Sequence, residues 1–193
     1  MTTPPYMGKA DEILDAAERR MRCGGFDAVS FRDLAAEVGI KSASVHYYFP
    51  QKADLGEAVV NRYADRFLKT LGPPDDPGDT VEARIARLCA AYRSAVIDDG
   101  RICLCCVLGG EALDLPPPVS AAIGRAFARI LDWTARALKA DEPGSHGPPL
   151  SATHIVASLQ GAMILAIATK QPGHFTDTEK HLMRMVRSRR ADV

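Results

Sequence analysis

The sequence predicts an all-α protein, with a head of three short helices followed by a larger helical body, about nine helices altogether. First, apolar residues recur at helical spacing, as at Phe31, Leu34, Ala35 and Val38. Second, the chain has neither convincing period-two alternation nor an Asn-Gly hairpin turn. Third, its 13 prolines fall at the ends of the long apolar segments, where a missing helical hydrogen bond costs least.

The segments between prolines and glycine-rich stretches give the expected helices in order. They are 9–24, 31–38, 42–49, 52–71, 79–98, 103–114, 118–140, 151–170 and 176–190. Segments 72–79 and 141–149 are rich in Pro, Gly and Asp and are predicted loops. The change from short to long helices near residue 50 predicts a first domain of residues 1–51 and a second of residues 52–193.

Composition excludes some classes of protein. The 193 residues include 47% hydrophobic residues, which excludes a disordered or collagen-like chain. The 24 basic and 24 acidic residues balance, so the net charge gives no support for nucleic-acid binding. No basic start precedes an apolar segment at the N-terminus, and the apolar run 155–168 is shorter than the roughly 20 residues that span a bilayer. Three of the five cysteines fall within four positions, a poor disulfide framework, and we expect a reducing cytoplasm and no membrane.

The head carries the most informative motif. Ser30 and Asp33 form a capping box that starts a short helix, and Gly39 can take the left-handed conformation that ends it. A second short helix begins at Ser42 and stops before Pro50. Two short helices joined by a tight glycine-containing turn are typical of a helix-turn-helix.

The second of these helices has two different faces. Val45 and Phe49 are four residues apart and should point inward. Residues 46–48 are His-Tyr-Tyr and cannot all face inward, since successive helical residues turn by about 100°. The opposite face is small, hydroxylic and aromatic, which suits the major groove of DNA, and Lys52 beyond it can anchor a phosphate. An ordinary helical hairpin is the alternative.

The stretch 30–55, SFRDLAAEVGIKSASVHYYFPQKADL, resembles the DNA-binding head of the tetracycline-repressor (TetR) family of bacterial regulators. The likeness includes Gly39, the aromatic cluster that ends in Phe49, and the spacing of Pro50, Lys52 and Leu55. His46 stands where the family usually has Tyr, and Lys41 where it often has Ser. The resemblance implies DNA contacts at Ser30, Arg32, Lys41, Ser42, Ala43, Ser44, His46, Tyr47 and Lys52.

The resemblance also implies a homodimer, in which the last two helices pair with their copies and the two heads read an inverted repeat. The apolar stripe of the helix 151–170 fits this role, and it gives a predicted dimer interface. Its residues are Ile155, Leu159, Met163 and Ile167. A stripe of this size also fits an intramolecular core, so both interpretations stay open.

The body contains a cluster of three cysteines, Cys103, Cys105 and Cys106. They could be buried small hydrophobes, thiols that react with an oxidant or electrophile, or metal ligands. No His lies close to them in sequence, which disfavours a metal site, and we expect no metal or cofactor. A predicted effector pocket takes its residues from this region and from the later helices. These are Cys103, Cys106, Glu111, Trp133 and Met163.

The sequence thus predicts a transcriptional repressor that binds a double-stranded operator as a homodimer and is released by a small-molecule effector of unknown identity. A repressor that senses oxidants or electrophiles through Cys103, Cys105 and Cys106 is the alternative. A cysteine-dependent enzyme is more distant, because the chain gives no Cys-His-Asn signature and we expect no catalysis. Residues 1–60 contain seven basic and nine acidic residues, so a head of net charge −2 should hold DNA with few ionic contacts.

Overall fold

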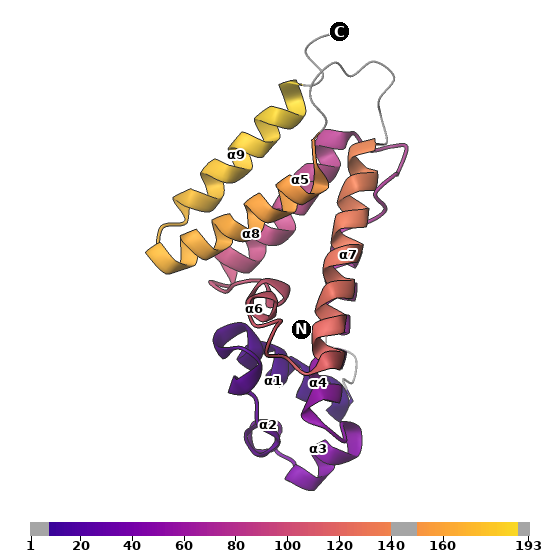
Figure 1. The fold of residues 1–193 in the computed structure, drawn as a ribbon, viewed down its shortest axis with the longest axis vertical. Helices are drawn as coiled ribbons and strands as arrows, with labels where there is room; N and C mark the ends of the chain where they lie inside the picture. Colours follow the sequence, from indigo (N-terminus) through magenta and orange to yellow (C-terminus); the bar gives the residue numbers. More distant parts are fainter. Residues whose placement is uncertain (1–7, 140–149, 189–193) are drawn as a thin grey trace, which may run out of the picture. The chain divides into compact units, whose positions relative to one another are not determined.

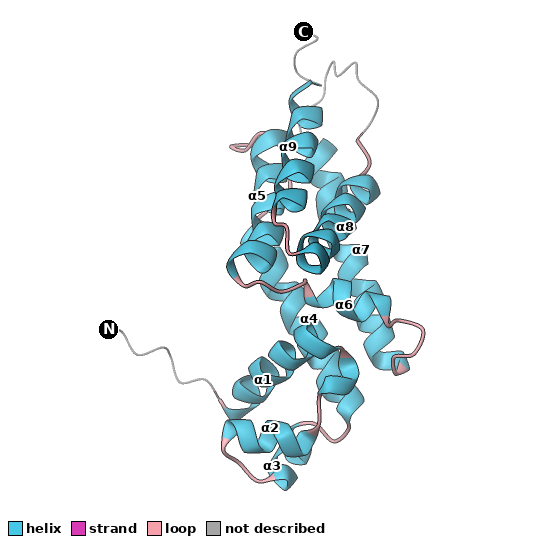
Figure 2. Ribbon diagram, turned by 90° about the vertical axis from the view of Figure 1, so that its left-hand side faces the viewer, coloured by secondary structure: helices cyan, strands magenta, loops and turns pink. Residues whose placement is uncertain are grey.

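The computed structural model describes residues 8–139 and 150–188, and within these ranges every regular element is helical (Figure 2). The predicted all-α fold is therefore confirmed. The α-helices are α1 (Lys9–Gly24), α2 (Phe31–Val38), α3 (Ser42–Tyr48), α4 (Lys52–Leu71), α5 (Val81–Arg93), α6 (Leu104–Gly110), α7 (Pro117–Lys139), α8 (Ala152–Thr169) and α9 (Gly173–Ser188). A 3₁₀ turn, η1, covers Phe26–Ala28, and a π-helical turn, η2, covers Ser94–Asp98. The predicted loop 141–149 lies outside the described residues.

The predicted caps determine where the short helices begin and end. The Ser30 Oγ accepts a hydrogen bond of 3.1 Å from the Asp33 N–H at the start of α2. Gly39 closes the same helix in the left-handed region, with φ of 72°. Helix α6 is shorter than predicted, since it stops at Gly110 instead of continuing to residue 114, and glycine is a poor residue for extending a helix.

By packing, the chain divides into two compact units. The first contains the described residues up to Ala64 together with Leu104–Ala126, and the second contains Asp65–Cys103 and the described residues from Phe127 onward. The cuts fall within α4 and α7, so both helices contribute residues to each unit. These packing units are not functional domains, and the division into residues 1–51 and 52–193 stays a prediction.

The core of the first unit joins α1 to the three helices that follow it. The side chains that share it are fully buried: Ile13, Ala17, Met21, Leu34, Val45, Leu55 and Val59. Gly56 lets α4 approach its neighbours closely, because a Cβ atom there would come within 2.7 Å of the Phe26 ring and 2.9 Å of Val119. Each short helix of the head is therefore fixed by at least one buried apolar side chain, because seven or eight residues form a helix of marginal stability alone.

In the second unit, α8 lies beside α9 and α5 (Figure 1). The core between them includes Leu88, Leu159 and Phe175, none of which is exposed to solvent. It also encloses a polar pair, in which the Gln160 Nε2 donates to the Tyr92 hydroxyl at 3.1 Å.

Candidate nucleic-acid interface

The α2–α3 pair has the geometry predicted for a helix-turn-helix. Helix α2 ends at Val38, and α3 begins at Ser42 after a turn that contains Gly39. Val45 has no exposed area and fixes the inner face of α3, while Phe49 follows the helix as a half-buried cap. The opposite face of α3 is thereby turned toward solvent.

The outward face of α3 carries the side chains predicted to read DNA. Ser42, Ala43 and His46 are exposed, and Tyr47 is 82% exposed. The His46 ring meets the Phe31 ring edge to face, with centroids 4.6 Å apart, so an aromatic contact between α3 and α2 holds its orientation. His46 Nδ1 also lies 3.3 Å from the Pro50 carbonyl oxygen and donates to it in the tautomer protonated at Nδ1.

Tyr48 was not among the predicted contacts, yet it belongs to the same surface. It is 40% exposed, and its ring meets the Tyr47 ring edge to face at 5.3 Å between centroids. Two neighbouring exposed tyrosines offer hydroxyl groups and flat rings to a groove. The run of three aromatic or imidazole residues at 46–48 was the available signal, since one helix cannot bury all of them.

The remaining predicted contacts surround α3. Lys41 immediately precedes the helix and is exposed, Ser44 is half-buried within it, and Ser30 caps α2. The Arg32 side chain is 91% exposed at the start of α2, with its Nε 3.7 Å from an Asp33 carboxylate oxygen. These residues belong to the same unit and to the α2–α3 pair, as the motif requires.

Lys52, the predicted phosphate anchor, is already engaged within the head. Its Nζ lies 4.4 Å from the centre of the Phe26 ring and 3.3 Å from an Asp27 carboxylate oxygen. The Lys52 side chain is one-third exposed, whereas the Asp27 side chain is fully exposed. The ammonium is thus held in place at the start of α4 while part of it still faces solvent.

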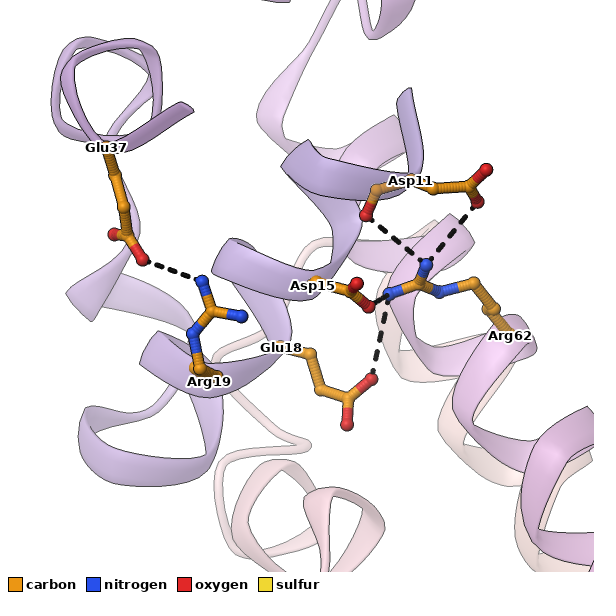
Figure 3. A network of polar contacts seen from close by, with 6 residues as sticks. All are labelled: Asp11, Asp15, Glu18, Arg19, Glu37 and Arg62. Carbon is orange, nitrogen blue, oxygen red and sulfur yellow. Dashed lines mark hydrogen bonds and ion pairs between the residues drawn. The ribbon is translucent and has the colours of Figure 1, made fainter. Parts of the chain in front are cut away.

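Ion pairs hold α2 against α1. The guanidinium of Arg19 donates to one Glu37 carboxylate oxygen at 2.9 Å (Figure 3), and Arg20 Nε donates to the other at 2.8 Å. These two hydrogen bonds hold the pKa of Glu37 below its ordinary value of 4.5. The Ser30 hydrogen bond and the nearby guanidinium groups likewise lower the pKa of Asp33. The first helix therefore fixes the second, which in turn supports α3.

A second network ties α1 to α4 (Figure 3). One Arg62 nitrogen lies 3.4 Å from the Asp11 carbonyl oxygen and 3.5 Å from its carboxylate. The other donates to Asp15 and lies 4.0 Å from a Glu18 oxygen. These acids stand on successive turns of α1, so one partly buried guanidinium meets three carboxylates along a single face.

The predicted effector residues are not placed as one group. Cys103 ends the first segment of the second unit, whereas Cys106 and Glu111 pack with the head in the first unit. Glu111 does not serve as a pocket wall there: its carboxylate accepts a hydrogen bond of 3.0 Å from the Phe26 backbone N–H. Trp133 is almost buried in the second unit, and its Nε1 donates to the Gly72 carbonyl at 2.7 Å.

Trp133 does border a surface hollow of about 520 Å³ in the second unit. The hollow lies between the end of α4 and one face of α7, and its other lining residues are Leu68, Gly72, Ala128, Arg129, Asp132 and Arg136. Arg136 is paired with Asp75 at 2.6 Å, a contact that lowers the pKa of Asp75. The structure leaves the predicted effector pocket a prediction.

The cysteines differ in their surroundings. Cys103 and Cys105 are buried, and Cys106 is half-buried. Cys89 on α5 is buried as well, and burial raises the pKa of its thiol to about 11, so it stays protonated at neutral pH. Among the described residues, no group of three or more His, Cys, Asp or Glu side chains is placed to hold a metal ion.

The residues predicted for the dimer interface lie mostly in the interior. Ile155, Leu159 and Met163 have no exposed area within the single chain, and Ile167 is half-buried. Packing against α5 and α9 takes up this stripe, so its first three residues have no surface to offer a second copy. The exposed apolar residues of α8 are instead Ile164 at 48% and Leu165 at 54%.

A hollow of about 510 Å³ lies beside Leu165 on the outer surface of α8 and α9. Its lining combines small and apolar residues of α8 with polar residues of α9: His154, Ala157, Ser158, Gly161, Ala162, Leu165, Asp177, Thr178, His181 and Leu182. By length and composition α8 is also apolar enough to cross a membrane, alone among the described helices. One such helix is weak support for a membrane span, since core helices of globular proteins have the same character.

Comparison with known proteins agrees with this architecture. Residues 13–59 match the sequence profile of the family described as bacterial regulatory proteins, tetR family. Over 82 residues the chain is 28% identical to the nucleoid occlusion factor SlmA of Shewanella denitrificans, a match that spans 42% of each protein. The chain therefore aligns with less than half the length of that relative.

Two solved structures resemble most of the chain. A TetR transcriptional regulator from Legionella pneumophila has a TM-score of 0.83 and 23% identity, with 94% of this chain and 98% of that one covered. A TetR-family regulator from Agrobacterium tumefaciens has a TM-score of 0.82 and 24% identity, covering 92% and 96% respectively. At these identities the likeness shows a shared fold, which extends well beyond the matched head.

Proposed function

The chain belongs to the TetR family of bacterial regulatory proteins, and we propose that it represses transcription by binding an inverted-repeat operator as a homodimer. The observation that carries the proposal is the exposed face of α3. Its inner side is fixed by buried Val45, and its outer side presents Ser42, His46 and Tyr47 to solvent. A helix held in this way can enter the major groove without rearranging the head.

A selection from random duplex DNA tests operator binding for any target sequence. The purified full-length protein should enrich an inverted repeat whose half-sites lie about one helical turn apart, or a multiple of it. Changing Tyr47 to Ala should weaken binding to the enriched duplex by about tenfold, the scale of one good base contact. Lys139→Ala, an exposed change at the end of α7, is the matched control and should leave binding unchanged. Failure to enrich any repeat would overturn the proposal.

The homodimer is proposed to form through the exposed face of α8 and α9 rather than through the buried stripe. Leu165 and Ile164 expose apolar area, and Ala157 and Gly161 beside them allow close approach of another helix. A twofold axis would place the same face of a second copy against this one. This arrangement accounts for an apolar helix of which only 33% of the residues are buried within one chain.

Light scattering during size exclusion tests the dimer. The 20.8 kDa chain should elute with about twice its mass. Leu165→Glu should give a monomer, because a charge at the centre of an apolar contact is costly to bury. Leu113, an equally apolar and fully exposed residue in the first unit, supplies the control, and Leu113→Glu should remain dimeric. A wild-type protein of single-chain mass would contradict this part of the proposal.

Release by a small-molecule effector completes the proposed function. The effector would bind in the second unit and favour a state of the dimer in which the two heads no longer match the operator spacing. A differential affinity of about 1.4 kcal/mol changes operator occupancy tenfold, so the coupling need not be large. Thiol modification is the alternative signal. Cys106 is half-buried on α6, whereas Cys103 and Cys105 are buried, so Cys106→Ser should abolish any release by oxidants.

A further inference from the structure

The junction between α1 and α2 is held by two residues that come from distant parts of the chain. It consists of Gly25, Phe26 and Asp27, which follow the end of α1 and precede the cap of α2. Glu111 contacts its backbone, and Lys52 contacts its side chains. All five residues belong to the same compact unit.

Glu111 reaches the junction through a gap that only glycine leaves. Its Oε2 accepts a hydrogen bond of 3.0 Å from the Phe26 N–H. A Cβ atom on Gly25 would overlap the Glu111 carboxylate, and Gly25 also has a φ of +75°, a conformation that L side chains rarely adopt. The carboxylate therefore lies where a side chain at residue 25 would otherwise stand.

Lys52 contacts the same junction from the first turn of α4. Its Nζ lies above the Phe26 ring and 3.3 Å from an Asp27 carboxylate oxygen. Gly56, one turn along α4, lets the helix approach that ring. An ammonium has three N–H donors, so the contact with Asp27 leaves donors for a DNA phosphate. Phe26 thus stands between the Glu111 carboxylate and the Lys52 ammonium.

Glu111 is also connected to α6. Its backbone N–H donates to the Leu108 carbonyl at 3.1 Å, which continues the last turn of that helix. A movement of the end of α6 would therefore carry the Glu111 carboxylate with it. The junction is the place at which such a movement would reach the DNA-binding side of the head.

We propose that Glu111 is a positioning residue for DNA binding, which fixes the Phe26–Asp27 junction and thereby places the Lys52 ammonium against a phosphate of the operator. The inference rests on the proposed function, since it concerns how the same head holds DNA. It assigns to Glu111 a role in the head instead of the effector contact expected from the sequence. It also identifies the α6–Glu111 connection as a route by which regulation can weaken DNA binding.

The salt dependence of operator binding tests this role in the full-length protein. Glu111→Ala should weaken binding to the selected duplex by about fivefold and reduce the slope of log K against log salt by about 1.8, because each of two heads loses one phosphate contact. Lys52→Ala should produce the same reduction. In the Lys52→Ala background, Glu111→Ala should change affinity by less than about twofold and leave the slope unaltered.

Two conservative variants separate positioning from folding. Glu111→Gln keeps an oxygen that accepts from the Phe26 N–H, so it should restore the wild-type slope. Glu111→Asp is one methylene too short to reach the N–H and should behave like Glu111→Ala. Circular dichroism checks that each variant is folded, and where Glu111→Ala is unfolded, the Asp variant takes its place.

The outcomes distinguish the two levels of the argument. Absence of wild-type operator binding would overturn the proposed function. Wild-type binding combined with an unchanged salt slope in both Glu111→Ala and Glu111→Asp would overturn the positioning role alone. Equal weakening by Glu111→Ala with and without Lys52 would also overturn it, since the residue would then act on the head as a whole.

Discussion

At the scale of single residues, two glycines of the head serve different purposes. Gly39 has φ of 72° and ψ of 36°, the left-handed conformation, and nothing lies within 4 Å of a Cβ built there. Gly25 has φ of 75° and ψ of −171°, a region essentially restricted to glycine, and its Cβ would overlap Glu111. Conformation alone constrains the first position, whereas conformation and space both constrain the second.

This contrast predicts unequal costs for the same substitution. Gly39→Ala should lower the free energy of unfolding by about 1 kcal/mol, the cost of a left-handed alanine. Gly25→Ala should lower it by about 2–4 kcal/mol, because strain is joined by loss of the Glu111–Phe26 hydrogen bond. Urea unfolding of both variants measures the difference. Equal costs would show that Glu111 moves aside freely and that its contact with Phe26 stabilises little.

At the scale of elements, the α1–α2 contact is a pH-dependent connection. Glu37 receives hydrogen bonds from Arg19 and Arg20, which keep its pKa in the folded protein below the ordinary 4.5. The ionised carboxylate therefore stabilises the folded state fully above about pH 4.5, and the stabilisation is lost as the pH falls through the lower folded-state pKa. The pair is partly exposed, so its contribution is at most about 1 kcal/mol.

Substitution of this carboxylate should flatten the acid limb of the stability curve. The urea midpoint of the wild-type protein should fall between about pH 4.5 and pH 3, since protonation breaks the pairs with Arg19 and Arg20. Glu37→Gln should begin lower and fall less over the same interval. Glu57, which pairs with Arg125 of α7 instead, provides the control variant Glu57→Gln. Parallel curves for wild type and Glu37→Gln would contradict the assignment.

The same scale shows what the sequence could and could not predict. Helix ends followed from local chemistry: Ser30 and Gly39 bound α2, and Pro117 lies in the first turn of α7, where its missing N–H does no harm. The α3 face was predictable because residues 46–48 cannot share one side of a helix. Partners distant in sequence were not predictable, as for Glu111, whose contact with Phe26 joins residues 85 positions apart.

The stripe on α8 illustrates the same limit. Ile155, Leu159 and Met163 recur at helical spacing, and that spacing identifies an apolar face without identifying what covers it. In the structure α5 and α9 cover this face, and the surface left for a partner carries Ile164 and Leu165. Only the tertiary packing distinguishes the two faces.

At the scale of the whole molecule, neutral charge constrains how DNA can be held. Residues 1–60 have a net charge of −2 by sequence, and the structure commits several of their basic groups to internal pairs. Lys9 pairs with Glu12, and Arg19 and Arg20 pair with Glu37. Arg32 and Lys41 remain on the exposed surface beside α3, and Lys52 faces solvent in part.

Operator binding should therefore show a moderate dependence on salt. Three basic groups in each head, Arg32, Lys41 and Lys52, give about six phosphate contacts in a dimer and a slope of log K against log salt near −5. Fluorescence anisotropy with the selected duplex between about 50 and 200 mM salt measures it. Arg32→Ala should reduce the slope by about 1.8, one contact for each head, whereas Arg19→Ala should leave it unchanged because Arg19 is bound to Glu37. A slope steeper than about −9 would require phosphate contacts from basic residues outside these three, and with them a DNA-binding surface larger than the one around α3.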